Sequence, residues 1–104
     1  METTITARHC EIGPALRERA SSITGRLGTV ASRPMDATVV FDQNGLACVA
    51  EIRFRVARGD VLVASAEAAD HRTALDRAEE KLRRQLEKTG SRYKAGRHAG
   101  TPDA

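Results

Sequence analysis

Four cations near the C-terminus have the spacing of a binding surface: Arg77, Lys81, Arg84 and Lys88. On an α-helix of 3.6 residues per turn they fall within an arc of about 60°. Arg92 continues the stripe, which then extends over about 22 Å at 1.5 Å per residue. Like charges at such spacings repel and destabilise a helix slightly, so the pattern is not explained by helix stability. A row of this kind can neutralise several nucleic-acid phosphates, and its binding should weaken steeply with salt.

An ordinary solvated helix face is the alternative interpretation of the same segment. Glu80 is placed to pair with Arg84 and with Arg83, and Glu79 is placed to pair with Arg83. Exposed pairs of this type each contribute only a few tenths of a kcal/mol. The sequence pattern alone leaves both interpretations open.

The other reactive side chains do not form a pattern typical of an enzyme. His9, His71 and His98 are far apart and have no zinc-site spacing, and Cys10 and Cys48 form no CxxC pair. No GxGxxG, P-loop or GxSxG motif occurs. We therefore expect no catalytic residue, no metal, no cofactor and no small-molecule substrate.

Length and composition indicate one small domain with an aliphatic core. The chain has 104 residues, of which 3% are aromatic, and its net charge is +3. It contains no apolar run long enough for a membrane span and no signal-peptide pattern, so we expect a cytoplasmic protein with reduced thiols. Charge is unevenly distributed, since residues 81–98 contain seven Lys and Arg against Glu87 alone. Such asymmetry is typical of proteins that bind polyanions.

Hydrophobic periodicity predicts the order β-α-β-β-β-α. The first helix begins at Pro14 and ends near Gly28, Asn44-Gly45 is a hairpin signal, and Asp70 is a plausible N-cap of the last helix. The expected strands span residues 3–9, 37–42, 46–56 and 61–67, and the last helix runs to about residue 89. The predicted fold class is α+β, a four-stranded, mainly antiparallel sheet with two helices packed on one face, similar to double-stranded-RNA-binding domains. Residues 1–90 form this single domain, and residues 91–104 are expected to be a flexible basic tail.

The alternation of apolar residues predicts which faces are buried. On the third strand Arg53 and Arg55 point outward, and on the last helix the core face is opposite the cationic stripe. The residues expected to be buried are Leu46, Cys48, Ala50, Ile52, Phe54 and Val56 on the strand, and Leu75, Ala78, Leu82 and Leu86 on the helix.

The sequence resembles the ribosome hibernation promoting factors, also called ribosome-associated translation inhibitors, over about residues 3–92. "ITARHCEIGPALRERA" is similar to the opening strand and first helix of the family, and "DVLVASAEAADHRTALD" to its final strand and second helix start. "KLRRQLEK" resembles the family's Lys-Leu-x-Arg-Gln-Leu-x-Lys run and is the most specific segment. After residue 90 only a short tail remains, so the resemblance is to a short form without the C-terminal dimerisation domain of long members.

The resemblance implies a ribosome-binding translation inhibitor. Family members occupy the tRNA and mRNA channel of the small ribosomal subunit, near the decoding centre, and keep ribosomes idle under stress or in stationary phase. The positions matching the family's rRNA-binding cations are Lys81, Arg84, Lys88 and Arg26. Arg77 and Arg92 join them on helical geometry, with less support from the family resemblance.

The sequence departs from the family pattern in two places. Arg72 occupies a position that is usually aromatic, and "GRLGTVASRP" replaces a Lys- and aromatic-rich segment. Two alternative functions also fit the sequence. One is a general double-stranded RNA-binding module without ribosome specificity, and the other is an adaptor whose basic stripe meets an acidic protein.

Overall fold

The computed structural model describes residues 1–31, 33–57 and 60–97, with side chains through Lys88. Within them the element order is the one predicted from the sequence. The elements are β1 (Glu2–Ala7), α1 (Pro14–Val30), β2 (Pro34–Asn44), β3 (Ala47–Val56), β4 (Val61–Ala68) and α2 (His71–Arg97).

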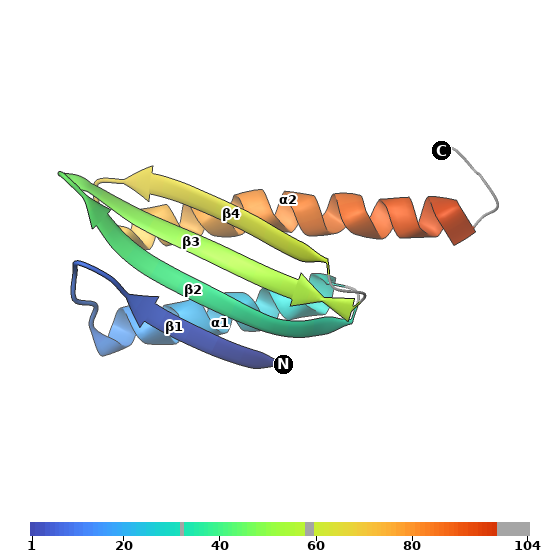
Figure 1. The fold of residues 1–104 in the computed structure, drawn as a ribbon, viewed down its shortest axis with the longest axis horizontal. Coiled ribbons are helices and arrows are strands. Elements are labelled where there is room, and N and C mark those ends of the chain that lie inside the picture. The colour runs from blue at the N-terminus through green and yellow to red at the C-terminus, as the bar shows by residue number, and fades with distance from the viewer. Residues whose placement is uncertain (32, 58–59, 98–104) are drawn as a thin grey trace.

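The four strands form one mixed sheet in the order β1-β2-β3-β4. The two β-hairpins make β2, β3 and β4 antiparallel, whereas β1 pairs parallel with β2 because α1 carries the chain back between them. Both helices lie against the same face of the sheet, and β1 and β4 form its two edges (Figure 1). The predicted α+β class with two helices on one face is confirmed.

The β2–β3 turn differs from its prediction by one residue. Asn44 still pairs with Ala47, so the two-residue loop is Gly45-Leu46 rather than Asn44-Gly45. Gly45 has φ +63°, as the first loop residue of a type II′ turn requires. Leu46 therefore sits at the tip of the hairpin and is 97% exposed, so its predicted burial is wrong.

The first helix begins as its sequence predicts. Gly13 is the N-cap and Pro14 follows at the first helical position, where a missing N–H costs nothing. Ala20, Ile23 and Leu27 are fully buried against the sheet. The helix extends to Val30, slightly beyond the end expected near Gly28.

The last helix is longer than predicted. It continues through Gly90 to Arg97, so the end expected near residue 89 is wrong. A glycine in a helix costs about 1 kcal/mol relative to alanine, which does not by itself stop a helix. Residues 98–104 of the expected tail lie outside the described residues. The division into a domain and a tail at residue 90 stays a prediction.

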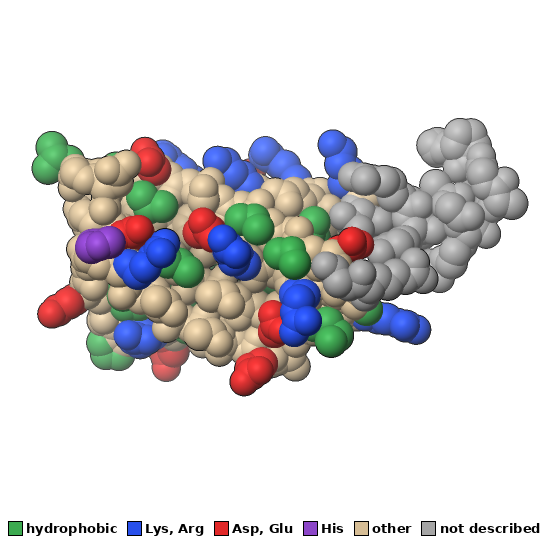
Figure 2. Space-filling model, in the orientation of Figure 1, with side chains coloured by type: hydrophobic (Ala, Val, Ile, Leu, Met, Phe, Trp, Pro, Cys, Tyr) green, Lys and Arg blue, Asp and Glu red, His purple; other side chains and the backbone are tan. Residues whose placement is uncertain are grey.

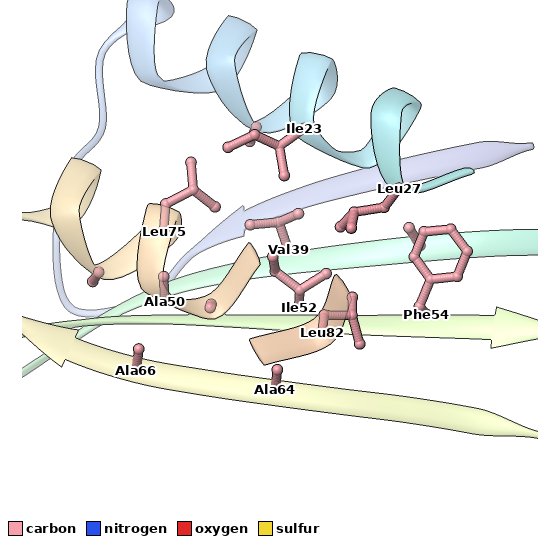
Figure 3. Packing of buried hydrophobic residues seen from close by; sticks show 14 of the residues in the cluster. Ile23, Leu27, Val39, Ala50, Ile52, Phe54, Ala64, Ala66, Leu75 and Leu82 are labelled. Carbon is pink, nitrogen blue, oxygen red and sulfur yellow. The ribbon is translucent and has the colours of Figure 1, made fainter. Parts of the chain in front are cut away.

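The core fills the space between the helices and the sheet (Figure 3). Leu75 and Leu82 of α2 lie over β3 and β4, where Ala50, Ala64 and Ala66 present small side chains that let the helix approach closely. Every residue predicted for the core face of α2 is buried, and Ala74 adds to it. On β3 the predicted burial is confirmed from Ala50 to Val56, whereas Cys48 is only half-buried. Because α2 is anchored through this face, its cationic side is directed away from the core.

Candidate nucleic-acid interface

Contacts at the start of α2 fix how the helix meets the sheet. The Asp70 carboxylate accepts hydrogen bonds from the backbone N–H of Thr73 (2.9 Å) and from its hydroxyl (2.8 Å), so Asp70 is the predicted N-cap. These two bonds hold the pKa of Asp70 below its ordinary value. Next to it, His71 donates from Nε2 to the Asp42 carbonyl (2.8 Å), and its ring stands edge-on to Phe41. The helix therefore begins locked to the end of β2.

The cationic stripe, Arg77, Lys81, Arg84 and Lys88, is exposed along its whole length. Figure 2 shows Lys and Arg side chains in a row along the upper edge of the molecule, beyond β4. Arg84 pairs with Glu80 one turn earlier (3.0 Å), a pair exposed on both sides. Lys88 has no hydrogen bond or ion pair within the described part of the chain. Of the ion pairs expected for an ordinary solvated helix face, the structure therefore forms one that involves the stripe, between Arg84 and Glu80.

Two members of the stripe reach the free edge of β4. Arg77 donates to the Glu67 carbonyl (3.0 Å), and Lys81 donates to the Ser65 carbonyl (2.9 Å). Gln85 extends the series by donating to the Val63 carbonyl (3.0 Å). Four helical residues advance about 6 Å and two strand residues about 6.6 Å, so successive contacts stay in step. These bonds leave the charges of Arg77 and Lys81 unneutralised and hold them at fixed positions.

Arg26 lies on the other flank of α2. It comes from α1 and pairs with Glu79 (3.2 Å), which also accepts from Arg83 (3.1 Å). Arg19 and Asp76 form a second ion pair between the helices (2.9 Å). The structure therefore does not bring Arg26 together with the stripe, because its partner on α2 is Glu79. The side chain of Arg92 lies outside the described residues.

A shallow groove runs along this second flank on the surface of α1. It has a volume of about 340 Å³ and is lined by Ala15, Glu18, Arg19, Ser22 and Arg26. Both of its arginines are already paired with carboxylates of α2. It is therefore less available to an anion than the stripe.

The outer face of the sheet carries compensated charge. Arg53 pairs with Glu51 (2.7 Å), and Arg55 pairs with Asp36 across the β2–β3 strands. The Asp36 hydrogen bond raises the pKa of Arg55. Both arginines point outward as predicted, yet each has an acid beside it, so this face is a weaker candidate for phosphates than the stripe.

The remaining reactive side chains that the structure describes form no site of their own. His9 bonds to the Asp42 carboxylate (3.0 Å), which lowers the pKa of Asp42, and burial raises the pKa of the Cys10 thiol. Among the described residues, no three His, Cys, Asp or Glu side chains are grouped so that they could hold a metal ion. In that same part of the chain, neither helix has the length and apolar character needed to cross a membrane.

Comparison with known proteins identifies the family. The model of the sigma 54 modulation proteins and S30EA ribosomal proteins matches residues 3–94. The chain belongs to this family. Its members are non-enzymatic, ribosome-associated proteins, which confirms the resemblance to the hibernation promoting factors and the expected absence of catalysis. Family membership also supports the predicted ribosome binding and translation regulation.

Two solved structures resemble this fold. A ribosomal subunit interface protein from Coxiella burnetii is 24% identical to this chain, with a TM-score of 0.76. The match covers 88% of this chain and 99% of the Coxiella chain. The N-terminal domain of Protein Y from Thermus thermophilus is 28% identical with a TM-score of 0.72, and covers 83% of this chain and 94% of its own. No curated protein matches the chain.

Proposed function

We propose that this protein inhibits translation by occupying the tRNA and mRNA channel of the small ribosomal subunit, keeping cytoplasmic ribosomes idle under stress or in stationary phase. The observation that carries the proposal is the exposed cationic stripe on a chain of a ribosome-associated family. Lys81, Arg84 and Lys88 are its central rRNA contacts, with Arg77 beside them and Arg92 beyond. Arg26 is a separate contact on the α1 flank.

The mechanism is steric exclusion rather than chemistry. The cations neutralise rRNA phosphates and release their counterions, while the folded body fills space that tRNA needs. With 3% aromatic residues the protein has few rings on which bases could stack, so backbone and shape contacts dominate the binding. The bonds from Arg77 and Lys81 to β4 order these side chains before binding, which reduces the entropy lost when they meet phosphates.

A general double-stranded RNA-binding module is the second candidate, because the fold and a basic last helix fit that function too. Such a module would bind any RNA duplex and would not require an assembled ribosomal subunit. The two functions therefore differ in their specificity for the target.

Cosedimentation tests the proposal directly. The purified protein is sedimented with small subunits and with vacant ribosomes at low and at moderate salt, with an equal mass of generic duplex RNA as the control. We expect saturable binding near one copy per small subunit and weak binding to the duplex. Equal binding to both would favour the general module, and binding to neither would refute both candidates.

A further inference from the structure

The backbone carbonyls on the outer edge of β4 are hydrogen-bonded to side chains of α2. Strand β4 is an edge strand, since it pairs with β3 alone in the sheet. Its outward carbonyls at Val63, Ser65 and Glu67 all accept hydrogen bonds from side chains of α2. Between Val63 and Glu67 the acceptors of this edge are therefore occupied by Arg77, Lys81 and Gln85.

Within the described part of the chain, the donors of the same edge have no acceptor. In an antiparallel pair a residue directs its N–H and its C=O to the same side. Because the carbonyls of Val63, Ser65 and Glu67 point away from β3, their N–H groups point away as well. All three residues are exposed. The edge thus offers a row of backbone donors about 6.6 Å apart, and the carbonyls between them are already bound to side chains of α2.

A row of backbone donors without free acceptors restricts which kind of partner can bind this edge. An added β-strand needs acceptors as well as donors from the edge, and the carbonyls that would serve it already bind α2. Arg77 and Lys81 retain spare N–H groups after these bonds, because a guanidinium has five and an ammonium has three. Backbone donors next to fixed cations fit an anion with several acceptor oxygens.

We propose that an RNA backbone lies along the outer edge of β4 beside the stripe, with phosphate oxygens accepting from the N–H groups of Val63, Ser65 and Glu67 as well as from Arg77 and Lys81. This proposal rests on the proposed function and adds the β4 backbone to the binding surface. The Glu67 side chain is the one acid on this edge strand and opposes the phosphate nearest to it. Removing its charge in Glu67→Gln should therefore tighten binding.

Hydrogen exchange measures the three donors without changing the protein. In the free chain the open N–H groups of β4 exchange freely, because no acceptor protects them. On saturation with small subunits, peptides covering residues 61–68 should gain protection at three amides. Strand β1, the opposite edge of the sheet, is the internal control and should gain no further protection. Saturable subunit binding with no new protection in β4 would overturn this inference while leaving the proposed function intact, whereas absence of binding would remove both.

A proline tests one donor specifically. Ser65→Pro deletes the outward N–H, and proline is tolerated on an edge strand when its nitrogen faces solvent. We expect Ser65→Pro to bind subunits about tenfold more weakly and Ser65→Ala, which keeps the N–H, to bind normally. If Ser65→Pro fails to fold, the exchange measurement on the unaltered chain still decides the matter.

A crosslink identifies what lies on this edge. The photoreactive residue benzoylphenylalanine, placed at Val61, reports its neighbour because Val61 is 52% exposed on the same strand. We expect crosslinks to rRNA. Crosslinks to a ribosomal protein alone would show that a protein segment covers β4 and would refute the RNA assignment.

Discussion

The stripe makes a quantitative prediction for the salt dependence of ribosome binding. In Lys81→Gln with Arg84→Gln, two cations are removed from the exposed side of α2 without touching its buried face. Each phosphate contact contributes about 0.9 to the slope of log K against log salt, so losing two lowers that slope by about 1.8. Between about 50 mM and 200 mM salt, the affinity of the variant should then change about tenfold less than that of the unaltered protein.

The assay is a binding titration against small subunits at several salt concentrations. Arg53→Gln with Arg55→Gln is the matched control, because it removes the same net charge from the outer face of the sheet, where both arginines pair with acids. The control should keep the original slope, and both double variants should stay folded. Equal losses of slope in the two variants would show that total charge, rather than the stripe, governs binding and would refute our reasoning.

Three further predictions concern the fold. Leu82→Asp should unfold the domain, because Leu82 is fully buried and an unpaired carboxylate there costs several kcal/mol on top of the lost packing. A circular dichroism spectrum of a folded variant would contradict the assigned core. Gly45→Ala should lower the free energy of unfolding by about 1 kcal/mol, since Gly45 has φ +63°. Gly25→Ala in mid-helix should instead raise it by about 0.5–1 kcal/mol. Denaturant titrations that give the same sign for both substitutions would refute this. The lowered pKa of Asp70 means that its carboxylate stabilises the fold above its unfolded pKa of about 3.9, and that this contribution is lost as pH falls through the lower folded pKa. Asp70→Ala should therefore show a shallower fall of Tm than the unaltered chain on acidification below about pH 5, and parallel curves would exclude the cap as the cause.

Local patterns in the sequence predicted most of the fold, because burial imposes them residue by residue. Ile52 and Phe54 alternate with outward arginines, and Leu75 and Leu82 recur at helical spacing, so each element carried its own signal. The hairpin loop was misplaced by one residue because Asn44-Gly45 also suits a turn with positive φ at both positions. The structure instead places Gly45 first in the loop.

The site was predictable only in part, for a different reason. Helical geometry alone predicted that Arg77, Lys81, Arg84 and Lys88 would share an exposed face. The hydrogen bond from Gln85 to β4 depends on where α2 lies relative to the edge of the sheet, which no local pattern encodes. Once that position is known, the spacing of four residues between Lys81 and Gln85 is a usable signal. The separation of Arg26 from the stripe likewise depends on which flank of α2 meets α1.

The parallel pairing of β1 with β2 has a consequence for how the chain folds during synthesis. The β2–β3 and β3–β4 hairpins close over short turns, whereas every β1–β2 pair joins residues 34 positions apart, so β1 has the larger loop-closure entropy to overcome and pairs more slowly. Until β1 has paired, Ile5 and the apolar side of α1 have no sheet to cover. We expect β1 to pair more slowly than either hairpin, although its partner β2 is synthesised before β3 and β4.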